Sequence, residues 1–84
     1  MITLVLAEDH HIVRQALRAL LATEKNLKVL SEASDGLEAI ELVERYKPDV
    51  LILDLMLPRL HGLEVIRRLH SEHSSTRVIV ISRG

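Results

Sequence analysis

Four side chains of this sequence have types and positions that suit phosphoryl chemistry. Glu8 and Asp9 are adjacent acids that follow an apolar run, Asp54 follows a second apolar run, and Ser82 follows a third. Carboxylate oxygens with room for water suit Mg²⁺, and a carboxylate beside such an ion can attack a phosphoryl group. The sequence therefore predicts a magnesium site with Asp54 as nucleophile and Ser82 as a hydrogen-bond donor to a phosphoryl oxygen.

The apolar runs before these residues predict strands. Residues 2–7, 50–54 and 77–82 are short and rich in Val, Ile and Leu, and a weaker segment covers 27–33. Short, nearly continuous apolar runs are typical of strands that are buried on both faces of a parallel sheet. Helical spacing of apolar residues in 12–21 and 63–70 predicts helices between these strands.

A third helix is predicted between Asp35 and Pro48. Asp35 is a good N-cap, Glu38 stands three residues later as in a capping box, and Pro48 disfavours helical backbone at Lys47. The elements then alternate as β-α-β-α-β-α-β, which predicts an α/β fold with a parallel sheet and right-handed crossovers.

This fold would bring the candidate residues to one edge of the sheet. The carboxyl ends of parallel strands meet at the same edge, where open α/β sheets bind ligands. If strands 2–7 and 50–54 are neighbours, Glu8, Asp9 and Asp54 converge. Like charges at such distances raise one another's pKa unless a cation lies among them.

The same residues resemble the receiver domain of bacterial two-component response regulators. The resemblance rests on Glu8-Asp9, on Asp54-Leu55-Met56-Leu57-Pro58 with Gly62, and on Ser82; residues 8–17 further resemble the NarL-like subfamily. It implies a flavodoxin-like (CheY-like) doubly wound sheet with strand order 2-1-3-4. It covers essentially the whole chain, which we expect to be one receiver domain over residues 1–84.

The resemblance also implies roles for individual residues. Asp54 is then the phosphoacceptor, Glu8 and Asp9 hold Mg²⁺ together with Asp54 and the backbone carbonyl of Met56, and Ser82 is the hydroxyl switch residue. A sensor histidine kinase is the implied phosphoryl donor. The implied output is regulation of transcription through a domain outside this sequence, and the implied module catalyses at most its own phosphotransfer and dephosphorylation.

Composition argues against a disulfide-stabilised, a membrane-spanning or a nucleic-acid-binding protein. The net charge is −1, there is no cysteine, and no apolar run approaches the length of a membrane span. We expect a cytoplasmic segment that binds neither membrane nor nucleic acid directly. Adjacent His10 and His11 would face different ways on a helix, so a zinc site is not favoured.

Family members continue beyond the fourth strand with a fifth strand, which carries a lysine, and two more helices. No lysine follows Ser82 in this sequence. Without a fifth strand beside it, the apolar strand 77–82 is expected to form an edge of the sheet. This predicts a homodimer, formed by edge-strand pairing or by exchange of elements. The alternative function is a degenerate receiver fragment that acts only as a dimerisation or interaction element. A phosphohydrolase of the haloacid-dehalogenase type would need a second Asp where Met56 stands.

Overall fold

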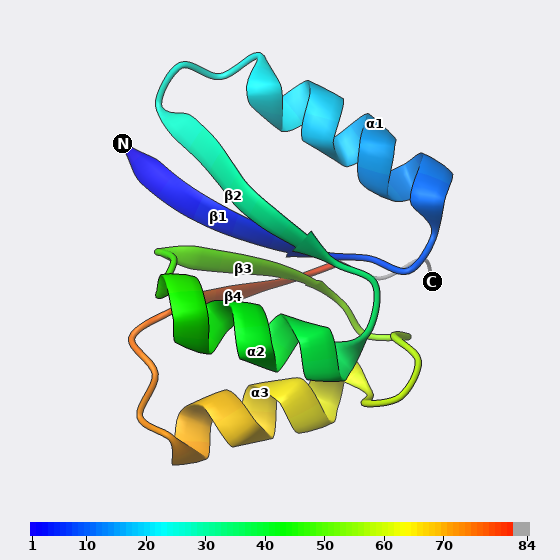
Figure 1. Ribbon diagram of the computed structural model, residues 1–84, viewed down its shortest axis with the longest axis vertical. Helices are drawn as coiled ribbons and strands as arrows, with labels where there is room; N and C mark the ends of the chain where they lie inside the picture. Colours follow the sequence, from blue (N-terminus) through cyan, green and yellow to red (C-terminus); the bar gives the residue numbers. More distant parts are fainter. Residues whose placement is uncertain (82–84) are drawn as a thin grey trace.

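The computed structural model describes residues 1–81 of the chain, which form four strands and three helices in strict alternation. The elements are β1 (Ile2–Ala7), α1 (His11–Ala22), β2 (Leu27–Ala33), α2 (Gly36–Tyr46), β3 (Val50–Asp54), α3 (Gly62–Ser71) and β4 (Arg77–Ile81). The predicted order of elements is confirmed (Figure 1). In residues 1–81, no helix is long and apolar enough to cross a membrane.

The strands form one parallel sheet in the order β2-β1-β3-β4, as predicted. Its register places Ala7 at the end of β1 beside Ala33 of β2 and Leu53 of β3. The residues that follow β1 and end β3 consequently share one edge. Within the described residues, β4 pairs with β3 alone and forms one edge of the sheet.

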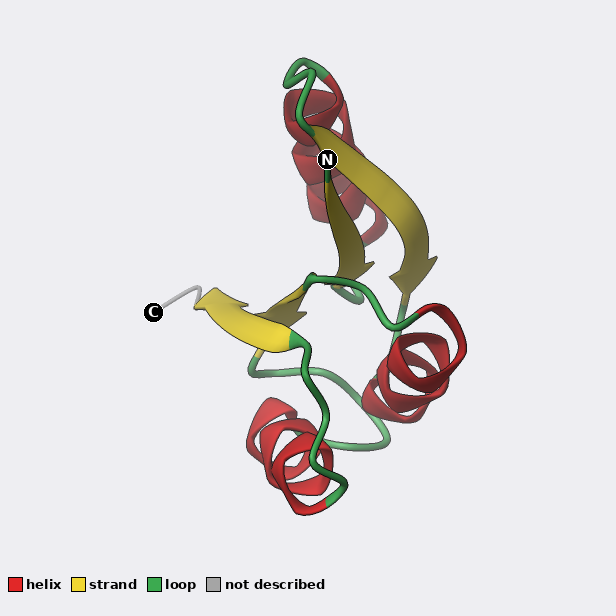
Figure 2. Ribbon diagram, turned by 90° about the vertical axis from the view of Figure 1, so that its left-hand side faces the viewer, coloured by secondary structure: helices red, strands yellow, loops and turns green. Residues whose placement is uncertain are grey.

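The helices cover the sheet unequally. Helix α1 lies on one face, over β1 and β2, while α2 and α3 lie side by side on the other face (Figures 1 and 2). The second face holds the core, because the buried apolar side chains of the central strands join those of α2 and α3 there. This cluster comprises Val5, Ala7, Ala33, Ala39, Ile40, Leu42, Val43, Leu51, Leu53, Leu57, Val65 and Leu69.

The α1 face is more open. Helix α1 contains no buried residue, and Ile12 and Leu20 are 80% and 66% exposed although they belong to its apolar pattern. On β4, Ile79 and Val80 are 53% and 42% exposed. The predicted apolar edge strand is therefore present among the described residues.

Helix α2 begins and ends where its sequence predicts. The Asp35 carboxylate accepts the N–H of Glu38 at 2.8 Å, which satisfies one of the free amides of the first turn. The Glu38 carboxylate accepts from the N–H and hydroxyl of Ser34 rather than from Asp35, so the capping box is shifted by one residue. Lys47 ends the helix in the left-handed region with φ 46°, directly before Pro48.

The loop after β3 turns back tightly onto the strand end. A Cβ atom on Gly62 would lie 2.6 Å from the Cα of Leu55, so only glycine allows α3 to start this close to the strand. The Gly62 N–H donates to the Leu55 carbonyl at 3.0 Å and closes the loop. This arrangement fixes the backbone that directly follows Asp54.

Candidate functional site

Three carboxylates meet at the carboxyl edge of the sheet. Glu8 follows β1, Asp54 ends the neighbouring strand β3, and Asp9 begins the turn toward α1. One ligand atom from each of these residues, and one from His10, lie within 4.8 Å of one another. The structure thus brings Asp54 together with Glu8 and Asp9, as predicted, although Asp54 is far from them in the sequence.

The acids of this cluster differ in exposure. Glu8 and Asp54 are almost fully buried, at 0% and 1% exposed, whereas the side chain of Asp9 is 29% exposed. Burial raises the pKa of Glu8 most, and hydrogen bonding with Asp54 raises this pKa further. The His10 N–H opposes these effects, while smaller contributions from the Asp9 hydrogen bond and the Asp54 charge again raise the pKa. Carboxylates crowded in this way favour a shared proton or a bound cation.

The backbone after β3 orients the Asp54 carboxylate. The N–H of Met56 donates to Asp54 Oδ1 at 3.0 Å. The side chain of Met56 is 64% exposed, so its contact with this region is through its main chain. The predicted use of its carbonyl as a metal ligand stays a prediction.

The hydroxyl residue Ser82 lies outside the described residues. Strand β4 is described up to Ile81, which pairs with Asp54 in the register of the sheet. The predicted role of Ser82 therefore stays a prediction.

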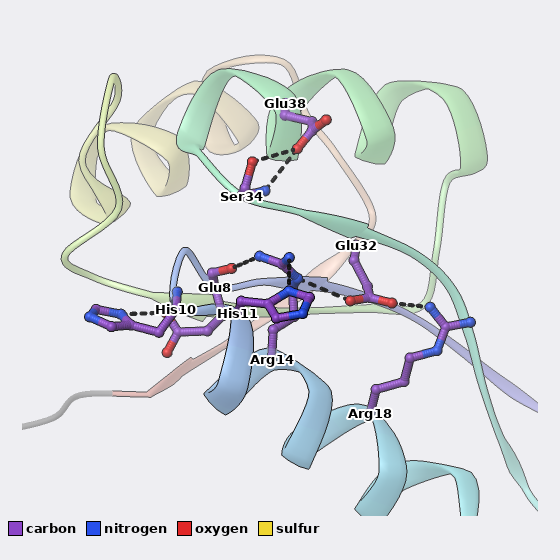
Figure 3. A network of polar contacts seen from close by, with 8 residues as sticks. All are labelled: Glu8, His10, His11, Arg14, Arg18, Glu32, Ser34 and Glu38. Carbon is purple, nitrogen blue, oxygen red and sulfur yellow. Dashed lines mark hydrogen bonds and ion pairs between the residues drawn. The ribbon is translucent and has the colours of Figure 1, made fainter.

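His10 also belongs to the cluster, which was not predicted from the sequence. The His10 Nδ1 lies 3.0 Å from Asp9 Oδ1. It also lies 3.6 Å from Oε2 of Glu8, which is drawn beside it in Figure 3. His10 is the N-cap of α1 and has extended backbone. Its side chain direction is therefore not set by the helical geometry that turns neighbouring side chains apart. His11 instead lies 3.3 Å from Arg14, and the two rings point apart, as predicted. The position of His10, directly after two acids and before the helix, is the feature of the sequence that could have indicated its place in the cluster.

The donor set fits Mg²⁺. Glu8, Asp9 and Asp54 offer hard oxygen ligands from one side, and the partial exposure of Asp9 leaves room for water ligands. The His10 nitrogen would add a ligand that suits transition metals better than Mg²⁺. Held there, a divalent cation would neutralise the carboxylates and the charge of an incoming phosphoryl group.

A surface pocket of about 340 Å³ lies elsewhere, between the carboxyl ends of α2 and α3 and the start of β4. Val43, Lys47, Leu69, His73 and Thr76 are among its lining residues. It lies at the edge of the sheet opposite to the carboxylates. We attach no chemistry to it, because it contains none of the clustered acids.

Comparisons with known proteins show which family the chain resembles. A sequence family described as the response regulator receiver domain matches residues 4–84. The chain is 38% identical to the uncharacterized transcriptional regulatory protein YhcZ of Bacillus subtilis over 79 residues, which cover 94% of the chain and 37% of that protein. It is 36% identical to the nitrate/nitrite response regulator protein NarL of Escherichia coli over 80 residues, covering 95% of the chain and 37% of that protein.

A solved structure shows the same fold. A DNA-binding response regulator of the LuxR family from Staphylococcus aureus superimposes with a TM-score of 0.95 at 33% identity, covering 100% of the chain and 70% of that structure. The chain spans little more than a third of the length of the two curated relatives.

Proposed function

Because the chain belongs to the response regulator receiver domain family, we propose that it accepts a phosphoryl group on Asp54 in a Mg²⁺-dependent reaction. The observation that carries the proposal is the convergence of Glu8, Asp9 and Asp54 at one edge of the sheet. A buried cluster of acids is costly to maintain without a cation, and a reacting group at this edge accounts for it.

In the proposed reaction an oxygen of Asp54 attacks the phosphorus of a phosphohistidine. The new O–P bond forms as the N–P bond breaks, and the imidazole nitrogen keeps the electron pair and later takes up a proton. The Met56 N–H on Oδ1 orients the carboxylate for this attack. Glu8 and Asp9 would hold the cation together with Asp54, and the cation would supply charge neutralisation at the phosphoryl oxygens.

Two further roles complete the proposal. The Met56 carbonyl is the remaining protein ligand of the metal, which its position two residues after Asp54 supports. Ser82 is the hydroxyl that donates to a phosphoryl oxygen, which the pairing of the preceding Ile81 with Asp54 supports. Membership of the receiver domain family supports both roles.

The proposed partners also follow from the family. The phosphoryl donor is a sensor histidine kinase in the cytoplasm, and the output is regulation of transcription through a domain outside this sequence. The names of the relatives, transcriptional and nitrate/nitrite response regulators, support that output. The module covers residues 1–84, undergoes phosphorylation rather than turning over a substrate, and leaves direct contact with DNA to the output domain, consistent with its net charge of −1.

The test uses acetyl phosphate as donor. With Mg²⁺ present, intact-mass measurement is expected to show one added phosphoryl group on the wild-type chain and none on Asp54→Asn. The matched control is Asp49→Asn, which makes the same chemical change at the opposite end of β3 and is expected to leave phosphorylation intact. A wild-type chain that gains no phosphoryl group, or an Asp54→Asn chain that still gains one, would contradict the proposal.

A second candidate function is self-association without phosphotransfer. It is favoured by the exposed apolar side chains Ile79 and Val80 on β4, which pairs with β3 alone within residues 1–81. We propose a homodimer in which β4 pairs with its counterpart or exchanges elements with it. Light scattering after size-exclusion chromatography is expected to show a dimer that persists in Asp54→Asn. A monomer at micromolar concentration would contradict this candidate.

A further inference from the structure

Arg14 links helix α1 to the backbone of the acidic cluster. Its side chain is only 16% exposed, and its Nη1 donates to the Glu8 carbonyl oxygen at 2.8 Å. Its Nε donates at 3.1 Å to Glu32 Oε1 on the neighbouring strand β2 (Figure 3). One planar guanidinium group thus holds both the end of β1 and a carboxylate of β2.

Glu32 in turn fixes the orientation of Arg14. The Glu32 side chain is 21% exposed and forms ion pairs with Arg14 and Arg18. Arg18 is 55% exposed and pairs with Glu32, whereas Arg14 also reaches the Glu8 carbonyl. The two arginines therefore share a carboxylate but differ in their contact with the cluster, which makes Arg18 a matched control.

The contact to Glu8 acts on a critical peptide group. The Glu8 N–H donates to the Ala33 carbonyl of β2 at 3.0 Å, and its carbonyl accepts from Arg14. Both main-chain polar groups of Glu8 are consequently held, one by the sheet and one by α1. A change of the ψ angle of Glu8 would displace Asp9 relative to Glu8 and Asp54, and the Arg14 hydrogen bond to the Glu8 carbonyl opposes that change.

We propose that Arg14 is a positioning residue, oriented by Glu32, that keeps the Glu8 and Asp9 carboxylates directed at Asp54 for binding a divalent cation. This inference rests on the proposed function, because it concerns the metal and phosphoryl site described above. Arg14 acts through the backbone and donates nothing to the metal or to the phosphoryl group.

Electrostatics alone predicts the opposite effect. A cation near three carboxylates repels a second cation, so replacing Arg14 with a neutral residue would tighten Mg²⁺ binding if charge were its main contribution. Positioning predicts weaker binding after the same replacement. The sign of the change in affinity therefore distinguishes the two effects.

The experiment is a Mg²⁺ titration of the full chain by isothermal calorimetry. Arg14→Gln is expected to weaken binding roughly 10-fold, as is typical for partners that orient metal ligands. Arg14→Lys keeps the charge but lacks the planar fork that reaches both Glu8 and Glu32, and it is expected to lose most of the affinity as well. Arg18→Gln removes an exposed ion pair, and its Mg²⁺ affinity is expected to stay within about 2-fold of wild type.

Circular dichroism of each variant checks the fold, and if Arg14→Gln fails to fold, Arg14→Lys and Glu32→Gln decide the question. Equal or tighter Mg²⁺ binding in the folded Arg14 variants would overturn the inference while leaving phosphorylation of Asp54 untouched. An equal loss in Arg18→Gln would also overturn it, because that result assigns the effect to general charge or helix stability. A wild-type chain that binds no Mg²⁺ overturns both the inference and the proposed function.

Discussion

Acidic side chains lie at both ends of the parallel strands, the amino-terminal edge and the carboxyl edge of the sheet, but in opposite surroundings. At the amino-terminal edge, the Asp49 carboxylate accepts the N–H and hydroxyl of Thr3 at 2.8 and 3.0 Å, and these donors lower its pKa. At the carboxyl edge, Glu8 lies among other carboxylates, and burial together with hydrogen bonding to Asp54 raises its pKa. Both edges belong to the same two central strands, β1 and β3.

The difference separates an acid that joins strands from acids that are clustered together. Asp49 joins the start of β3 to β1, because its carboxylate and its N–H both form hydrogen bonds with Thr3. Its carbonyl also accepts the N–H of Arg77 at the start of β4. The carboxylates at the other edge accept N–H groups of Met56 and His10 but also lie beside one another, and such crowding of like charges favours cation binding. Perturbation in this direction is typical of functional sites.

The largest expected effect is stabilisation by Mg²⁺. At about 100 times its dissociation constant, an ion that binds only the folded chain adds about 2.7 kcal/mol to the free energy of unfolding. Thermal unfolding followed by circular dichroism is expected to show this gain in the wild type and to lose it in Asp9→Asn. Asp49→Asn is expected to keep it, and a similar gain in Asp9→Asn would show that the ion acts by general screening.

Next in size is a change confined to the amino-terminal edge. The Thr76 hydroxyl is buried and donates to the Pro48 carbonyl at 2.7 Å. Thr76→Val leaves that carbonyl without its donor and is expected to cost about 2 kcal/mol in urea unfolding. Mg²⁺ affinity is expected to be unchanged, and Ser75→Ala at the exposed neighbouring residue serves as control. A change in Mg²⁺ affinity would show that the two edges are coupled.

A smaller effect of opposite sign is expected at the carboxyl edge. Without Mg²⁺, Glu8→Gln removes one of the crowded charges while keeping the shape of the side chain. It is expected to raise the free energy of unfolding at pH 7 by about 1 kcal/mol, and to lower the stabilisation that Mg²⁺ gives. Glu44→Gln, on the exposed side of α2, is the control. A destabilised Glu8→Gln chain would mean that Glu8 is a structural acid like Asp49.

The smallest effect is the pH dependence that Asp49 contributes. Its folded pKa is lowered from the ordinary value of 3.8, so its ionised form stabilises the fold above that pH. This stability is lost as the pH falls below 3.8 through the lowered pKa. At pH 7 the free energy of unfolding of the wild type is expected to be slightly higher than that of Asp49→Asn. This difference is expected to vanish in acid, as measured by urea unfolding at several pH values. A difference that stays constant with pH would contradict this assignment.

Much of the fold could be predicted from local patterns. The apolar runs give β1 and β2 with the bounds observed, and Asp35 and Pro48 mark the ends of α2 because capping and the absence of a proline N–H are local effects. The exposure of Ile12 and Leu20 could not be predicted, because it depends on which surfaces lie opposite α1. Periodicity predicts that an apolar face exists but not how much of it is covered.

The sequence by itself determined that Glu8, Asp9 and Asp54 stand at strand ends, since an apolar run followed by an acid is a local property of the chain. Only the tertiary structure decided that these acids lie together, because that requires β1 and β3 to be neighbours. It also decided that the His10 ring turns toward Asp9 and that Arg14 bridges Glu8 and Glu32. The Arg14 contacts join residues from different elements, and the packing of α1 against the sheet sets their distances.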